Sequence, residues 1–184
     1  MRTQVETSPP LPPVREIVFL EFRVGDIRLA VPIQRLNEIL RYRPAQPVPN
    51  APPFIEGLIH LRGDLIPILD LRKRFGYDAA VTRKTRILIT WLQRFPIGLV
   101  VDAAHAFIRV EIERIRPLPA IPETPMADLL IAAVVQDDQI VYIPDVDMLL
   151  HPYEMQAWQE FQEQQGIPER EMTKDNASRA ESAD

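Results

Sequence analysis

Apolar and polar side chains alternate along the first part of the chain that has residues to bury. Residues 18–24 are apolar at every second position, and residues 27–33 repeat this period after Gly25-Asp26. Alternation on both sides of a short Gly-Asp pair is typical of two antiparallel strands joined by a tight turn. The pattern therefore predicts a β-hairpin as the first ordered element.

The period changes in the next segment, QRLNEIL. Leu36, Ile39 and Leu40 have the spacing of one helical face, which predicts a short helix of about two turns. Residues 43–53 then contain five prolines, which remove backbone donors and restrict the backbone. We expect a stiff loop there, because neither a helix nor a central strand can pass through it.

A second hairpin follows the proline-rich segment. The apolar runs near residues 56–62 and 64–70 predict two strands, with the turn at Gly63-Asp64. The segment LRKRFG then predicts one helical turn closed by Gly76, since glycine readily takes the left-handed conformation at a helix end.

The remaining strands are expected after a polar linker at residues 77–85. They fall at residues 86–92, 97–101, 107–112, 129–135 and 139–143, with a proline-rich loop at 117–125 and a turn at Asp137-Asp138. The segment IPILDL resembles the later segment IPDVDM, which favours two similar β-units over one large sheet. Many short strands with few helices predict a mainly β fold of two small barrels side by side.

A helix is expected in the segment after the last strand. Met155, Trp158 and Phe161 form a narrow apolar stripe, and Gly166 marks the end of the helical pattern. We expect this helix to dock on its own barrel; the alternative is a helix that binds a partner.

The expected organisation has three parts. Residues 1–15 are a disordered N-terminal segment, because they have almost nothing to bury. Residues 16–150 form the β-domain. The boundary between its two barrels is expected near residues 76–86, and either end of the domain can cross over to the other barrel. Residues 151–184 contain the helix and an acidic disordered tail.

Charge and composition restrict the partners. Of the 26 acidic and 21 basic residues, eight acidic and three basic ones lie from His151 onward, which leaves 18 of each in residues 1–150. A neutral body without a basic run argues against nucleic-acid binding and against an anionic membrane surface. No apolar run is long enough for a membrane span, none resembles a secretion signal, and cysteine is absent. We therefore expect a cytoplasmic protein without direct membrane insertion.

The residue types that usually carry catalysis do not form a recognisable set. The three histidines are far apart and lack metal-ligand spacing, the only serines lie in the expected disordered ends, and no glycine-rich phosphate motif occurs. Asp70 and Asp102 come at strand ends, where we expect them to cap the following turns rather than to act as a catalytic pair. We expect no enzymatic activity, no cofactor and no metal site.

The segments FLEFRVGDIRLAVPIQRLNEIL and VPNAPPFIEGLIHLRGDLIPILDLRKRFG, with IGLVVDAAHAFIRVEIERIRPLP and IAAVVQDDQIVYIPDVDMLL, point to one family. Over about residues 16–150 the chain resembles the CheW family, the adaptors of bacterial chemotaxis. The resemblance implies two five-stranded β-barrel subdomains of SH3-like shape and no enzymatic activity. It also implies two partners, the cytoplasmic tip of a chemoreceptor (methyl-accepting chemotaxis protein) and the regulatory domain of the histidine kinase CheA. The adaptor would then be recruited to membrane-associated receptor arrays.

The resemblance also implies a receptor-binding groove between the two barrels. Its motif residues in this sequence are Glu38, Gly57, Arg62 and Gly63, and we add the neighbouring Leu36 together with Gly98 and Leu99 from the second barrel. In the family the glutamate and the arginine are thought to pair. We expect a largely buried pair, of which losing one partner would cost about 3–5 kcal/mol. The alternative is a solvent-exposed hairpin arginine whose pairing contributes under about 1 kcal/mol.

Two departures and two alternatives accompany the resemblance. The family usually has asparagine where His60 stands and glycine near Ala132, so receptor choice or local packing can differ. One alternative is a CheW-like scaffold in a non-flagellar pathway, such as pili-based motility or second-messenger control. The other is a single-stranded nucleic-acid-binding small barrel, against which the neutral body counts.

Overall fold

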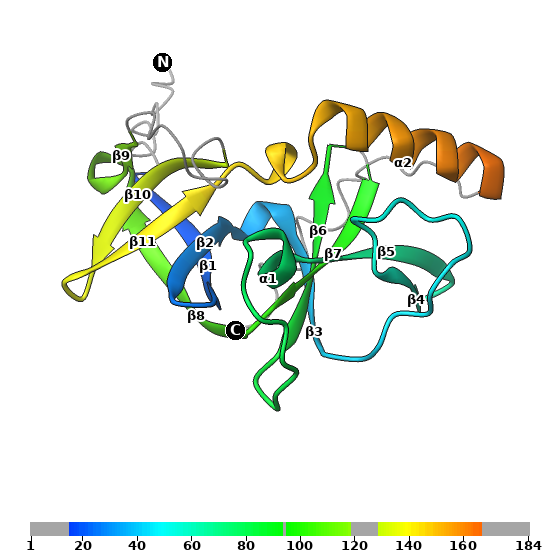
Figure 1. Ribbon diagram of the computed structural model, residues 1–184. Helices are drawn as coiled ribbons and strands as arrows, with labels where there is room; N and C mark the ends of the chain where they lie inside the picture. The colour runs from blue at the N-terminus through cyan, green and yellow to red at the C-terminus, as the bar shows by residue number, and fades with distance from the viewer. Residues whose placement is uncertain (1–14, 94, 119–128, 167–184) are drawn as a thin grey trace, which may run out of the picture.

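Two β-sheets side by side make up most of the molecule. The computed structural model describes residues 15–93, 95–118 and 129–166, and Figure 1 shows the two sheets with one long helix above the second. The predicted mainly β fold is confirmed. The six-stranded sheet has the order β8-β1-β2-β11-β10-β9, and the five-stranded sheet has the order β3-β6-β7-β5-β4.

The elements have the following bounds. The six-stranded sheet contains β1 (Glu16–Val24), β2 (Ile27–Pro32), β8 (Ala103–Glu111), β9 (Arg116–Pro117), β10 (Leu130–Gln136) and β11 (Gln139–Pro144). The five-stranded sheet contains β3 (Leu36–Arg41), β4 (Gly57–Leu61), β5 (Asp64–Asp70), β6 (Arg86–Leu92) and β7 (Phe95–Val101). The helices are η1 (Ile33–Arg35), α1 (Leu71–Arg74), η2 (Ile112–Arg114), η3 (Val146–Met148) and α2 (Pro152–Gln165).

The chain changes sheets twice. The first hairpin, β1 and β2, pairs with β8 and β11 from the second half of the chain, so the early strands complete a sheet whose other strands come much later. The changes occur at η1 and at Asp102, between β7 and β8. The polar linker at residues 77–85, near the predicted boundary, instead connects α1 to β6 within the five-stranded unit.

The predicted internal similarity has a structural counterpart. β5, which carries IPILD, pairs in parallel with β7, and β11, whose last two residues begin the later copy, pairs in parallel with β2. Each strand leads to an aspartate that caps the next turn: Asp70 accepts from the backbone of Arg72, and Asp145 accepts from the backbone of Asp147. The two units therefore share a parallel strand pair followed by a turn with a capping aspartate, although the second cap, Asp145, lies two positions earlier in its segment than Asp70 does.

Apolar side chains fill three regions of the β-structure. Phe19, Val110 and Val141 belong to the interior of the six-stranded sheet, and a run of isoleucines that includes Ile59 and Ile87 fills the five-stranded one. The largest cluster draws on both sheets and joins them. Its buried members are Leu20, Phe22, Val24, Leu29, Val31, Leu69, Leu71, Leu88, Leu92, Phe95, Ile97, Leu99, Val101, Leu129, Val146, Leu149, Leu150 and Met155. Because the sheets share this core, burial favours one fixed arrangement of the two.

The predicted helix in QRLNEIL is wrong. Only η1 is helical, and Leu36 begins β3, which pairs with β6. The register shifts between Leu36 and Glu38, so the strand contains an irregularity that changes the face on which later residues lie. Leu36 and Ile39 consequently pack on the same core although they are three positions apart. The bulge gave a strand the apolar spacing of a helix.

The C-terminal helix α2 docks on its own molecule, as expected. Trp158 and Phe161 are buried against Ile55 and the proline-rich segment. The helix begins with a capping box between His151 and Glu154 and ends at Gly166, which has the left-handed conformation at φ 64°. The expected loop at residues 117–125 lies mostly outside the described residues. So do residues 1–14 of the expected disordered segment 1–15 and residues 167–184 of the expected acidic tail.

Candidate functional site

The two edge strands of the five-stranded sheet approach each other. β3 and β4 lie at opposite ends of the strand order, yet Arg62, at the β4–β5 turn, places Nη2 3.2 Å from Oε1 of Glu38 on β3. Nearby, the guanidinium of Arg43 donates to the backbone oxygen of His60 at 2.7 Å. The sheet is therefore curled, and we call the line where Glu38 and Arg62 meet the seam.

The pairing of Glu38 with Arg62 is present, but the predicted burial is wrong. The side chain of Arg62 is 71% exposed, and that of Glu38 is 26% exposed. An ion pair this open is screened by water, so it contributes under about 1 kcal/mol to folding. Arg62 and Gly63 have φ angles of 51° and 93° and form the turn itself, one position earlier than predicted. The turn directs the arginine along the surface of the molecule.

Gly57 has a structural explanation. It is buried at φ 148°, and a β-carbon there would lie 2.3 Å from the backbone oxygen of Gln46. The close approach allows Gln46 and Leu58 to exchange two backbone hydrogen bonds at 2.8 and 2.9 Å. Glycine at this position fastens the proline-rich segment to β4.

Gly98 and Leu99 do not line a surface groove. Both lie on β7 of the five-stranded sheet, not in the other sheet as predicted, and both are buried. A β-carbon on Gly98 would lie 2.4 Å from the end of the Ile68 side chain, and Leu99 is 3% exposed in the shared core. The structure brings Glu38, Arg62 and Gly63 together at the seam, with half-buried Leu36 on the same strand as Glu38.

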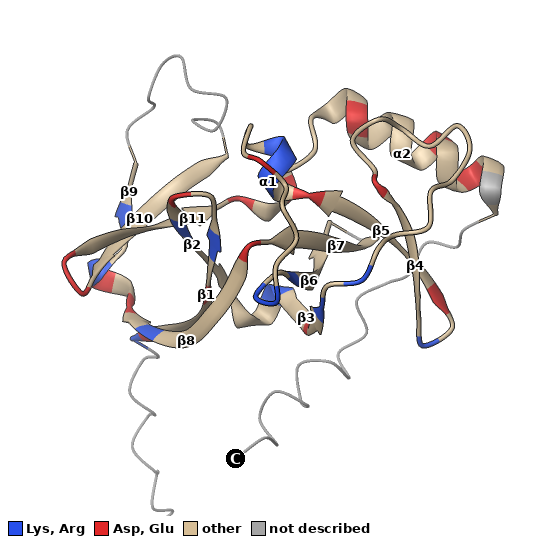
Figure 2. Cartoon of the chain, turned by 60° about the horizontal axis from the view of Figure 1, so that its bottom comes forward, with Lys and Arg blue, Asp and Glu red and all other residues tan. Residues whose placement is uncertain are grey.

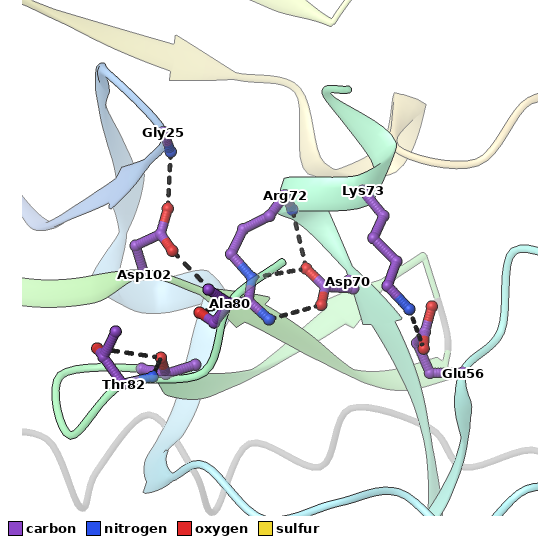
Figure 3. A network of polar contacts seen from close by, with 9 residues as sticks. Gly25, Glu56, Asp70, Arg72, Lys73, Ala80, Thr82 and Asp102 are labelled. Carbon is purple, nitrogen blue, oxygen red and sulfur yellow. Dashed lines mark hydrogen bonds and ion pairs between the residues drawn. The ribbon is translucent and has the colours of Figure 1, made fainter. Parts of the chain in front are cut away.

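Arg72, a buried arginine at the junction of the two sheets, was not identified from the sequence. Arg72, whose side chain is 1% exposed, donates through Nε and Nη2 to the two oxygens of Asp70 at 3.0 and 2.7 Å. Its Nη1 donates to the backbone oxygen of Ala80 and lies 3.6 Å from Oδ1 of Asp102. Figure 3 shows Asp102 reaching from Arg72 to the backbone N–H of Gly25, which donates to it at 2.7 Å.

This network fixes the relative position of the sheets. Asp70 and Arg72 belong to the five-stranded unit, Gly25 belongs to the β1–β2 turn of the other sheet, and Asp102 lies where the chain crosses between them. The predicted capping role of Asp70 is confirmed, whereas Asp102 binds the backbone of the distant β1–β2 turn and not the turn that follows it. The hydrogen bonds with Asp70 raise the pKa of Arg72 above its ordinary value, which keeps the guanidinium charged. The only sequence signal was the short D-x-R spacing at a strand end.

Two further ion pairs join segments that are distant in sequence. Arg74 on α1 binds Glu154 on α2 through two hydrogen bonds at 2.6 and 2.7 Å, and Glu154 is 5% exposed. Arg35 on η1 pairs with Asp147 on η3, which also accepts from the backbone N–H of Gln93. These contacts hold the crossover segments and α2 in place.

The two departures from the family pattern lie in different environments. His60 is exposed on β4, two positions before Arg62 of the predicted receptor surface, whereas Ala132 is 9% exposed in the core of the six-stranded sheet. Within the described residues no group of three or more His, Asp or Glu side chains could hold a metal ion. None of the helices in the described part of the chain combines the length and the apolar character needed to cross a bilayer.

Comparisons with known proteins agree with this architecture. A family model described as a CheW-like domain matches residues 18–154. The chain is 31% identical over 144 residues to a probable chemotaxis protein CheW of Rhizobium etli, covering 78% of this chain and 92% of that protein. It is 34% identical over 102 residues to the protein FrzA of Myxococcus xanthus, covering 55% of this chain and 64% of that protein. The crystal structure of the scaffolding protein TtCheW from Thermoanaerobacter tengcongensis superposes with a TM-score of 0.66 at 28% identity, covering 72% of this chain and 91% of that one.

Proposed function

The chain belongs to the CheW-like family, and from this we propose that it couples a chemoreceptor to the histidine kinase CheA. Family members are scaffold proteins of chemotaxis signalling, not enzymes. In the proposed role the chain binds the helical cytoplasmic tip of the receptor with one surface and the regulatory domain of the kinase with another. It would then work at the cytoplasmic side of membrane-associated receptor arrays.

The observation that carries the receptor side of the proposal is the contact across the seam. Glu38 and Arg62 come from edge strands at opposite ends of the sheet order and still meet at 3.2 Å. Because this pair is open to solvent, its charges remain available to polar groups of a docked helix. Leu36, half-buried on the same strand, supplies an adjacent apolar contact for such a helix. Gly98 and Leu99 no longer belong to the proposed contact set, since both are buried.

A separate apolar surface supports a second partner. Val135 and Ile140 lie directly opposite each other on β10 and β11 and are 55% and 52% exposed, and Ile131 on β10 is 51% exposed. These side chains belong to the six-stranded sheet, whereas the seam belongs to the five-stranded one. Exposed aliphatic side chains gathered on one sheet are typical of a protein-binding surface. We assign this surface to the kinase side of the proposal.

Single substitutions at the seam test the receptor surface. Glu38→Ala and Arg62→Ala are expected to fold as the parent does and to weaken binding to an immobilised receptor cytoplasmic fragment. Neither should reduce binding to the isolated regulatory domain of CheA, because that partner uses the other surface. Arg109→Ala is the matched control, an exposed strand arginine in the six-stranded sheet. Unchanged receptor binding by folded Glu38→Ala and Arg62→Ala proteins would overturn the assignment of the seam.

A further inference from the structure

A pocket rich in arginine opens where β3 ends and β6 begins. It has a volume of about 480 Å³ and is lined by Arg41, Tyr42, Val81, Thr82, Arg83, Thr85 and Arg86. Figure 2 shows basic residues gathered at this end of the five-stranded sheet and on the adjoining loop. We call these seven residues the arginine pocket. Its lining includes three arginines and no carboxylate.

The positive charge of the pocket is not neutralised by the described part of the protein. The ion pairs found among the described residues involve other cations, and none includes Arg41, Arg83 or Arg86. Arg41 and Arg86 are directly opposite each other on antiparallel strands. Like charges in this position repel and destabilise strand pairing. An anion bound between them would replace that repulsion with two attractions.

The loop that forms one wall is held in a defined shape. The backbone N–H of Thr82 donates to Oγ1 of Thr85 at 2.9 Å, and Oγ1 of Thr82 accepts from the backbone of Lys84 at 3.1 Å. Nη1 of Arg86 donates to the backbone oxygens of Arg83 and Thr85 at 2.8 and 2.9 Å. A prearranged wall lowers the entropic cost of ordering side chains around a ligand.

We propose that the arginine pocket binds an organic phosphate. Guanidinium groups hold phosphate oxygens through paired, charge-assisted hydrogen bonds, for which the flat arginine fork is better suited than lysine. The volume is within the range of small-molecule sites, about 300–1,000 Å³, and so leaves room for an organic group beside the phosphoryl group. The half-buried ring of Tyr42 offers that group an apolar face. An open pocket of this size fits a small phosphate ester better than an acidic peptide, which needs an extended surface.

The phosphate could belong to a soluble ester or to a lipid headgroup, so the experiment has two arms. In one arm, calorimetry measures binding of a nucleoside diphosphate to the full chain at low salt. In the other, the chain is sedimented with phosphatidylglycerol vesicles and, for comparison, with phosphatidylcholine vesicles. Saturable binding at one site in either arm is expected and identifies the source of the phosphate.

Variants link binding to the pocket. Arg41→Gln and Arg83→Gln are each expected to weaken binding about tenfold, as for the loss of a hydrogen bond to a charged group. The control Arg109→Gln, an exposed arginine on β8, should bind as the parent does. Without ligand, the melting temperature of Arg41→Gln should be no lower than that of the parent, because the substitution removes a like-charge pair. If Arg41→Gln is nevertheless unstable, Arg83→Gln, in the loop, provides the binding test.

Three results would overturn the proposal. The first is the absence of saturable binding in the nucleotide arm and also in the vesicle arm. The second is a loss of binding in Arg109→Gln that equals the loss in Arg41→Gln and Arg83→Gln. The third is tighter binding of a glutamate-rich peptide than of the phosphate. The proposal does not depend on the scaffold function, and its failure would leave that function untouched.

Discussion

Replacement of Arg72 by methionine tests whether a buried charge network holds the two sheets together. Arg72→Met keeps an unbranched apolar stem but removes the guanidinium. The variant leaves Asp70, which is 6% exposed, with only its backbone donor, and deprives Asp102 of its cationic neighbour. Removing one partner of a buried ion pair costs about 3–5 kcal/mol, because the remaining charge stays buried without compensation.

The expected loss is large enough to measure by urea denaturation. With a slope of about 2 kcal/mol per molar urea, a loss of about 4 kcal/mol lowers the midpoint by about 2 M. The slope itself should not change if the variant still unfolds in one step. Arg72→Lys keeps the charge but cannot form the fork to both oxygens of Asp70, so its midpoint should lie between those of the parent and Arg72→Met.

The neighbouring residue supplies a matched control. Lys73 on the same helix pairs with Glu56 at 2.6 Å, but its side chain is 54% exposed. Lys73→Met should therefore cost under about 1 kcal/mol. If Arg72→Met and Lys73→Met lowered the midpoint equally, or if Arg72→Met cost less than about 1 kcal/mol, the reasoning from burial would be refuted.

Three further substitutions test other parts of the structure. Gly57→Ala should destabilise the protein by about 1–3 kcal/mol in thermal melts, since its β-carbon would meet the backbone oxygen of Gln46 at 2.3 Å; a melt like that of the parent would contradict the packing described. Trp158→Ala should cost about 3–5 kcal/mol and make α2 more susceptible to limited proteolysis, because the side chain is 2% exposed; an unchanged cleavage pattern would show that α2 does not depend on it. Because the seam pair is exposed, Glu38→Ala and Arg62→Ala should each lower the free energy of unfolding by under about 1 kcal/mol, measured by urea denaturation. A larger loss would mean that the pair is buried in solution.

Local signals predicted most of the strands and turns. Asp137 and Asp138 have φ angles of 50° and 57° and form the two-residue turn expected between the last strands. Gly76, at φ 76°, follows α1 as predicted. Such features depend on a few adjacent residues, so the sequence contains enough information to identify them.

Features that depend on distant pairing were not predictable in the same way. The bulge after Leu36 gave a strand helical spacing, and only the pairing of β3 with β6 reveals it. The burial of Arg62 was overestimated, because the sequence does not show how far a turn projects from a barrel. The burial of Arg72 was missed, because its sequence context is that of an ordinary helical arginine. The completion of one sheet by β1 and β2 likewise depends on contacts with strands more than 75 residues later.

The most direct test of the adaptor proposal measures recruitment of the kinase. A receptor cytoplasmic fragment is immobilised, and the amount of CheA retained is determined with the parent chain, with Arg62→Glu, and without either. The account predicts that the parent chain increases retention of CheA and that Arg62→Glu loses this effect while still binding the isolated CheA regulatory domain. Retention that is the same with and without the parent chain would contradict the adaptor function.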